Sequence, residues 1–111
     1  MKVYELRRTA TQSERGESLL GFRELGSHAC YMIYGILKPG EQRRKIKPGR
    51  GHEEILLAIM GDIHATGCYT GTLKEGSAIH IRGEEECFCE NTGESEVVYI
   101  IAGGHTETKA H

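Results

Sequence analysis

Residues 53–61 read EEILLAIMG, and residues 76–91 read GSAIHIRGEEECFCEN. In both stretches short apolar runs are bounded by glycine or by charged residues, and Ile supplies much of the bulk. Because β-branched residues favour a pleated, half-buried surface, the two stretches predict strands over 53–60, 77–82 and 86–91.

The same pattern extends along the chain on both sides of these stretches. Further apolar runs predict strands at 3–6, 18–25, 29–37 and 96–102. Turn residues recur roughly every 8–12 residues, which is typical of sandwiches and barrels rather than of βαβ units. No helical periodicity of about ten residues or more is evident in the sequence. We therefore predict an all-β fold.

Length and composition narrow the class of protein. The chain has 111 residues and a net charge of −2, which fits one domain over residues 1–111 and gives no case for nucleic-acid binding. No apolar run approaches the ~18 residues of a membrane span, and the N-terminus lacks the apolar stretch of a signal peptide. We expect a cytoplasmic protein with no membrane partner, whose cysteines are reduced thiols.

The spacing of several residues resembles that of small single-domain members of the cupin superfamily. The second cupin motif has the form G-x5-P-x-G-x2-H-x3-N, and the stretch from Gly76 to Asn91 has this spacing without a gap. The first motif ends in E-x6-G, which matches Glu54 and Gly61. The resemblance implies a double-stranded β-helix, or jelly-roll, barrel.

Two further features agree with this resemblance. LKPG at 37–40 and LKEG at 73–76 stand at corresponding corners before new strands. The conserved barrel would span residues 37–102. The resemblance also implies a homodimer, and the nearly continuous apolar run EVVYIIA at 96–102 suits a strand covered on both faces.

The chain departs from the cupin pattern at the metal ligands. Cupins normally hold a metal with two His of an H-x-H step, the motif Glu and a later His. If the usual His-Pro step is aligned on Pro48, Lys45 and Lys47 occupy the first two ligand positions, and counting back from Glu54 places no His there either. Cys87 stands in place of the later His. Only Glu54 is retained, so an intact 3-His-1-Glu site is excluded.

One hypothesis is a rebuilt metal site. His52 and Glu54 are two residues apart, as are Cys87 and Cys89, so on strands each pair shares a face. A set of imidazole, carboxylate and thiolate ligands would suit Zn²⁺ or Fe²⁺. The alternative is that both Cys side chains fill the barrel and His52 sits in a rim turn.

A second hypothesis uses the basic cluster at 43–50. If Lys45 and Lys47 faced the cavity, their ammonium groups would favour a carboxylate or phosphate ligand. Arg82, which replaces the motif proline, would add donors, and His80 alternates with Ile in a way that could project it into the barrel. The alternative is a solvated edge strand whose charges discourage edge pairing.

Three classes of function remain. The first, which we favour slightly, is a barrel that binds a small polar or anionic ligand, because most of the metal ligands are lost. The second is a metal-dependent oxygenase, isomerase or decarboxylase, and the third is a structural or regulatory module. A Ser-His-Asp triad has no support, since Asp62 is the sole Asp of the chain and falls in a turn.

Overall fold

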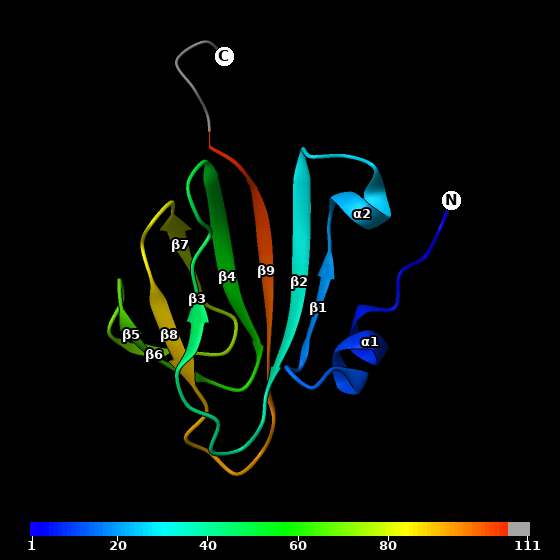
Figure 1. Cartoon of the computed structure of the whole chain (residues 1–111). Coiled ribbons are helices and arrows are strands. Elements are labelled where there is room, and N and C mark those ends of the chain that lie inside the picture. Colours follow the sequence, from blue (N-terminus) through cyan, green and yellow to red (C-terminus); the bar gives the residue numbers. More distant parts are fainter. Residues whose placement is uncertain (107–111) are drawn as a thin grey trace.

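Two antiparallel sheets packed face to face form the body of the molecule, in a computed structural model that describes residues 1–106 (Figure 1). Residues 107–111, which the expected domain includes, lie outside the described residues. One sheet has the order β1 (Glu17–Leu20), β2 (Cys30–Leu37), β9 (Val97–His105), β4 (His52–Met60), β7 (Ala78–Arg82). The other has the order β3 (Arg44–Ile46), β8 (Cys87–Glu90), β5 (Ile63–Gly67), β6 (Gly71–Leu73). The predicted all-β double-stranded β-helix is confirmed.

The N-terminal third differs from the prediction. The strand expected at 3–6 is wrong: residues 3–5 form no regular structure, and helix α1 (Leu6–Gln12) begins at Leu6. The strand expected at 18–25 is divided into β1 and the short helix α2 (Phe22–Leu25). The carboxylate of Glu24 accepts a hydrogen bond from the backbone N–H of Gly21 at 2.8 Å, which stabilises the first turn of α2. Neither helix is long enough for its periodicity to show in the sequence.

Three observed strands lie outside the predicted ranges: β3, which was considered only as the edge-strand alternative for 43–50, and β5 and β6, which were not considered. β5 and β6 are short and carry small or polar residues, with sequences IHATG and GTL. Only Ile63, Ala65 and Leu73 of these strands are buried in the core. Such short half-buried strands are defined by their partners β8 and β5 rather than by their own composition.

The core lies between the two sheets. It combines Leu56 of β4 and Tyr99 of β9 with Ile63 of β5 and Cys89 of β8, all of which are fully buried. Asn91, which aligned with the last residue of the second motif, is also buried, and its amide donates to the carbonyl groups of Leu37 and Ser95. This motif residue therefore closes one end of the barrel.

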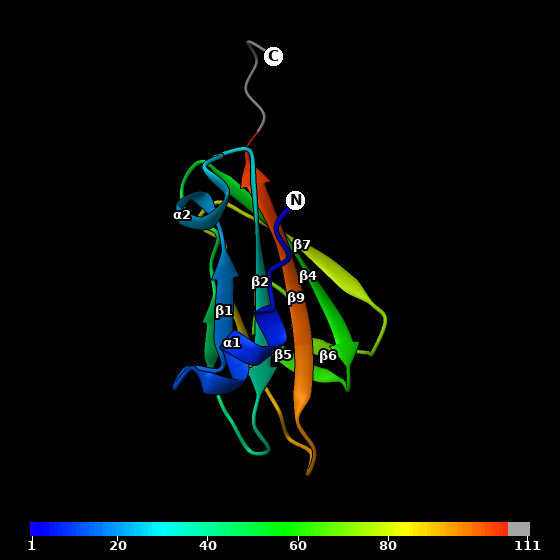
Figure 2. The same ribbon diagram turned by 90° about the vertical axis from the view of Figure 1, so that its right-hand side faces the viewer.

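The outer face of the five-stranded sheet is only partly covered. Helix α1 lies over β1 and β2 (Figure 2), while the outer face of β4 carries the exposed apolar side chains of Ile55 and Ile59. Met32 of β2 and Met60 at the end of β4 are exposed as well. Among residues 1–106, no helix has the length and apolar character needed to cross a membrane.

Candidate functional site

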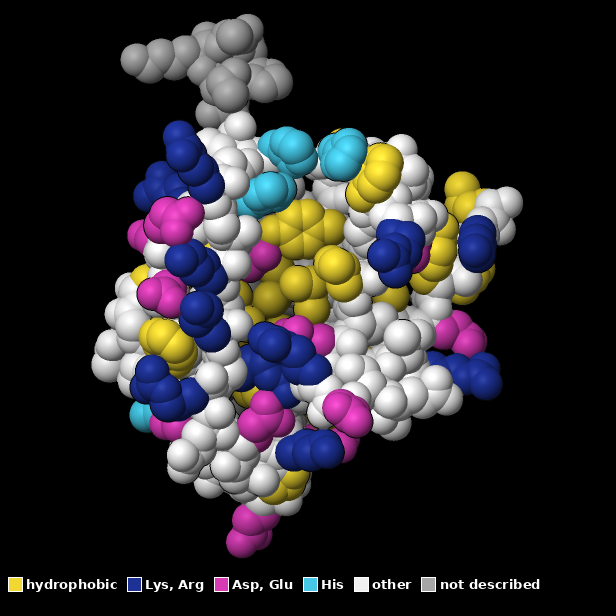
Figure 3. Space-filling model, viewed as in Figure 1, with side chains coloured by type: hydrophobic (Ala, Val, Ile, Leu, Met, Phe, Trp, Pro, Cys, Tyr) yellow, Lys and Arg dark blue, Asp and Glu magenta, His cyan; other side chains and the backbone are white. Residues whose placement is uncertain are grey.

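A cleft of about 340 Å³ opens where β2 and β4 begin, β9 ends and α2 approaches the sheet. Its floor holds Glu54 and Tyr31, and Leu19 and Ile33 contribute apolar wall. Figure 3 shows histidine side chains gathered at the upper edge of a hollow with hydrophobic side chains beneath them. The remaining lining residues are Gly21, Phe22, Ser27, His28, Cys30, Pro48, His52 and His105.

Glu54 and Tyr31 form a hydrogen-bonded pair at the floor. The Tyr31 hydroxyl donates to Glu54 Oε2 at 2.5 Å. Burial raises the pKa of Glu54, which is 5% exposed, although the hydrogen bond from Tyr31 opposes that shift. Burial and the adjacent carboxylate raise the pKa of Tyr31 far above its ordinary value, so its hydroxyl stays protonated and remains a donor.

A glycine makes this pair possible. Tyr31, Gly103 and Glu54 lie in one row across β2, β9 and β4, with Gly103 as the cross-strand partner of both. A Cβ at position 103 would lie 2.2 Å from the Tyr31 ring. The absence of a side chain at Gly103 therefore lets the Tyr31 ring lie across β9 and reach a carboxylate two strands away.

Three imidazoles surround the opening of the cleft. His52 and His105 are cross-strand partners with ring centroids 5.0 Å apart, and the His28 and His105 centroids are 6.3 Å apart. The Phe22 ring stacks on His28 at 3.9 Å. The sequence singled out only His52 of these, because His28 and His105 come from distant segments that meet through the pairing of β2, β9 and β4.

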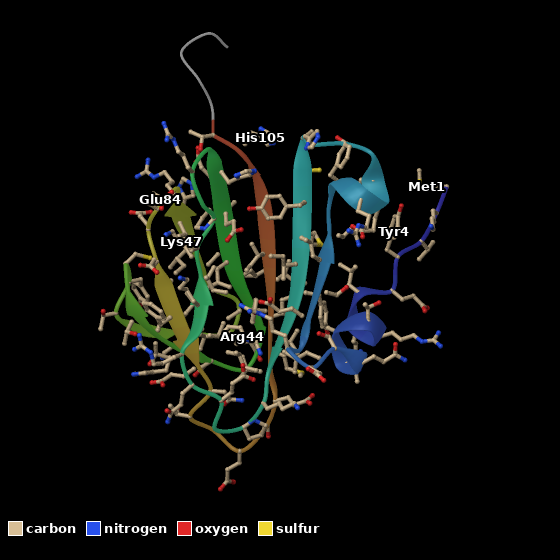
Figure 4. All side chains as sticks on the ribbon, in the orientation of Figure 1. Met1, Tyr4, Arg44, Lys47, Glu84 and His105 are labelled. Atoms are coloured by element: carbon tan, nitrogen blue, oxygen red, sulfur yellow. The ribbon has the colours of Figure 1, made fainter. Side chains whose placement is uncertain are left out.

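The basic residues predicted to bind an anion are not gathered at this cleft. Lys45 points outward from the edge strand β3 and pairs with Glu86 at 3.3 Å, while Lys47 pairs with Glu84 at 3.0 Å (Figure 4). Alternation along β3 explains the direction of Lys45, since Arg44 and Ile46 occupy the buried positions.

The other two predicted ligand-binding residues lie outside the barrel. The expectation that His80 projects inward is wrong: His80 is on the outer face of β7, where its Nε2 lies 2.7 Å from Glu53 Oε1. Ile79 and Ile81 take the inward positions instead. Arg82 is exposed at the end of β7. The structure therefore does not bring Lys45, Lys47, His80 and Arg82 together.

The predicted metal-ligating set is not assembled either. His52 and Glu54 line the cleft, but Cys87 and Cys89 are fully buried in the core and do not line it. The neighbouring thiols of Cys89 and Cys68 lower the pKa of Cys87 to about 7, and Cys89 contributes most. Within residues 1–106, no three His, Cys, Asp or Glu side chains converge so as to hold a metal ion. The four residues thus do not fit the implied metal centre, and the expected core role of the two Cys matches their position.

A buried polar cluster at the other end of the barrel was missed by the sequence analysis. The Arg44 guanidinium donates to the Tyr99 hydroxyl at 3.1 Å and to the Glu41 carboxylate, and Tyr99 donates to Glu17. Arg44 is 7% exposed, and Figure 4 shows it in the interior between the sheets. The alternation of Arg44 with Lys45 was the available signal, but it does not say which of the two faces inward. No buried polar side-chain atom of this cluster lacks a hydrogen-bond partner. We therefore assign the cluster a structural role.

Three solved structures show what this fold resembles. A protein described as a predicted oxalate decarboxylase from Thermotoga maritima is 18% identical with a TM-score of 0.66, over 81% of each chain. An uncharacterised protein with a double-stranded β-helix domain from Klebsiella pneumoniae is 12% identical with a TM-score of 0.61, over 71% of this chain and 70% of that one. The Cnp3 cupin domain of Schizosaccharomyces pombe is 14% identical with a TM-score of 0.61, over 70% of this chain and 57% of that one. No family model matches the sequence. No curated protein matches it either.

Proposed function

Because its fold is that of the cupins, we propose that this chain binds a small polar molecule in the cleft floored by Tyr31 and Glu54. One observation carries the proposal: Glu54 offers an open acceptor. Its Oε2 is held by Tyr31, while Oε1 has no hydrogen-bond partner among residues 1–106 and is not sealed from solvent. A buried carboxylate with one free oxygen in a concave, largely apolar cleft is typical of ligand sites.

The sequence favoured a polar or an anionic ligand; the proposal retains the polar ligand and rejects the anionic one. The lysines that motivated an anion are engaged with Glu84 and Glu86 outside the cleft. An anion at the floor would meet the carboxylate of Glu54 without a compensating Lys or Arg among the lining residues. The negative charge of the anion and that of Glu54 would repel each other, and the low dielectric of a buried site strengthens this repulsion.

A fragment screen of the whole chain by ¹⁵N–¹H NMR tests the proposal. We expect polar fragments to shift the amide signals of residues around Tyr31, Glu54 and His105, and Ser27→Trp to abolish these shifts by filling the cleft. Thr92→Trp is the matched control, since Thr92 is exposed in the loop between β8 and β9. Figure 1 shows this loop at the other end of the barrel. Hits that survive in Ser27→Trp would refute the assignment to this cleft.

We also propose that a second copy of the chain covers the outer face of the five-stranded sheet. Met32, Ala102 and Ile55 form one apolar row across β2, β9 and β4, with Ile100 and Leu57 in the next row. A stable dimer buries about 800 Å² per partner, and the exposed side chains of Ile55 and Met32 would contribute to such an interface. Light scattering at micromolar concentration should give a dimer mass for the wild type and Val3→Glu, and a monomer mass for Ile55→Glu. A monomeric wild type would overturn this proposal.

The alternative of a metal-dependent enzyme draws support from the likeness to the predicted oxalate decarboxylase. It has less support than ligand binding, because its four predicted ligands lie in two separate places. Metal analysis of protein purified without chelator decides between them. A stoichiometric transition metal that is lost in Glu54→Gln and retained in Cys87→Ser would place a metal in the cleft and replace our proposal.

A further inference from the structure

The charged residues that line the cleft indicate whether its ligand is positively or negatively charged. Among its lining residues, Glu54 is the sole Asp, Glu, Lys or Arg. Because Glu54 is buried, water screens its charge only weakly. The ionised carboxylate therefore strongly repels a second negative charge and strongly attracts a positive one.

The cleft is also rich in aromatic rings. Phe22 and Tyr31 are among its lining residues, together with His28, His52 and His105. The faces of Phe and Tyr rings attract cations electrostatically, and aromatic cages are used to bind quaternary ammonium ligands. The apolar walls would meanwhile desolvate a hydrocarbon body attached to the charged group.

From these features we infer that the ligand is a small organic ammonium ion, whose N–H groups donate to Glu54 Oε1 while its apolar body packs among the rings. The inference rests on the proposed function and names the ligand class for the same cleft. At about 340 Å³ the cleft is at the small end of ligand pockets, which commonly measure about 300–1,000 Å³, so a compact amine fits and a large ligand does not.

The affinity of such a ligand depends on pH in a defined direction. Burial raises the pKa of Glu54, so a bound cation favours loss of the Glu54 proton, and affinity rises with pH through that titration. Three neighbouring groups also influence the pKa of Glu54. The charge of Glu17 raises this pKa, whereas the charge of His52 and the hydrogen bond from Tyr31 lower it. The imidazoles of His28 and His105 also line the cleft.

Three probes of similar shape but different charge test the inference: benzylamine, benzyl alcohol and benzoate. Their affinities for the whole protein are measured by ¹⁵N–¹H NMR titration at neutral pH. We expect benzylamine to bind in the cleft at least about tenfold more tightly than benzyl alcohol, and benzoate to bind weakest. Glu54→Gln should remove the preference for the amine over the alcohol. Glu53→Gln is the matched control, because Glu53 is the neighbouring carboxylate on the outer face of β4, and it should leave the preference unchanged.

The outcomes separate this inference from the proposed function. If benzyl alcohol or benzoate binds in the cleft as tightly as benzylamine, or if the amine preference survives in Glu54→Gln, the ammonium inference is overturned and small-molecule binding stands. If none of the probes and no hit of the fragment screen shifts cleft signals, both fall. The pH dependence of benzylamine binding to the wild type serves as a second measurement should Glu54→Gln fail to fold. A pH-independent affinity would overturn the inference.

Discussion

The Tyr31 hydroxyl on β2 reaches across β9 to the Glu54 carboxylate on β4. The same arrangement, a tyrosine that reaches across a glycine to a glutamate two strands away, occurs a second time in the molecule. Tyr99 on β9 reaches across Gly35 on β2 to the carboxylate of Glu17 on β1, and a Cβ at position 35 would lie 2.0 Å from the Tyr99 ring. One tyrosine–glycine–glutamate row forms the floor of the cleft, and the other closes the core beneath it.

Gly103→Ala should separate Tyr31 from Glu54. The new methyl group would overlap the Tyr31 ring, which must rotate away or strain the sheet, at a cost of about 1–3 kcal/mol in the free energy of unfolding. Urea denaturation measures this loss. Gly93→Ala is the control, because a Cβ there meets only the Asn91 side chain, at 3.5 Å. Equal stability of the two variants would contradict the role assigned to Gly103.

Arg44→Met should be among the most destabilising single changes on β3. It would leave the carboxylates of Glu17 and Glu41 close together without their cation, and breaking a buried ion pair in this way costs about 3–5 kcal/mol. Lys45→Met, at the adjacent exposed position, removes a surface pair worth about 0–1 kcal/mol. Unfolding free energies in urea compare the two, and a Lys45→Met effect as large as that of Arg44→Met would contradict the buried cluster.

The ionisation of Glu54 should weaken the fold as pH rises. Its pKa is raised in the folded protein above the ordinary value of 4.5, so the folded state holds this proton to higher pH than the unfolded state. The resulting stabilisation is fully present below pH 4.5 and is lost as pH rises through the folded pKa.

Glu54→Gln removes this titration while keeping an acceptor for Tyr31. Relative to the wild type, the variant should therefore gain unfolding free energy as pH increases through that window. Urea denaturation of both proteins between about pH 4 and pH 8 measures the difference. A difference that is flat with pH, or that changes in favour of the wild type, would show that the pKa of Glu54 is not raised.

The cysteines should differ sharply in reactivity. Burial raises the pKa of Cys68 to about 11, so its alkylation by iodoacetamide should accelerate about tenfold per pH unit between roughly pH 7 and pH 10. Cys87, with a pKa of about 7, should remain unmodified in the folded protein, because its side chain has no exposed surface. Peptide mapping by mass spectrometry follows each thiol. Alkylation of Cys87 as fast as that of Cys68 at neutral pH would show that the β8 core opens readily.

The regular part of the fold was predictable because its signals are local. The strands expected at 29–37, 53–60, 77–82, 86–91 and 96–102 are present with small shifts at their ends. The residues that matched the cupin spacing are also structural: Gly61 has a φ of 83°, and its N–H donates to Glu75 at 2.8 Å in a turn. Such positions are set by backbone geometry, which a short motif can encode.

The candidate cleft was only half predictable: Glu54 and His52 were singled out, as metal ligands, while Tyr31, His28 and His105 were not. Tyr31 reaches the cleft floor only through Gly103 and Glu54, which are far from it in the chain. The directions of Lys45 and Arg44 likewise depend on the register of β3 against β8, and a shift of one residue would exchange them.

The sequence by itself determined the all-β class and the jelly-roll spacing, because both depend on residue type and local separation. The tertiary structure decided which charges face inward. It buried Arg44 and Glu54, left Lys45 and His80 outside, and gathered three imidazoles at one opening. These outcomes depend on the pairing of distant strands, whose register selects one face of every alternating side chain.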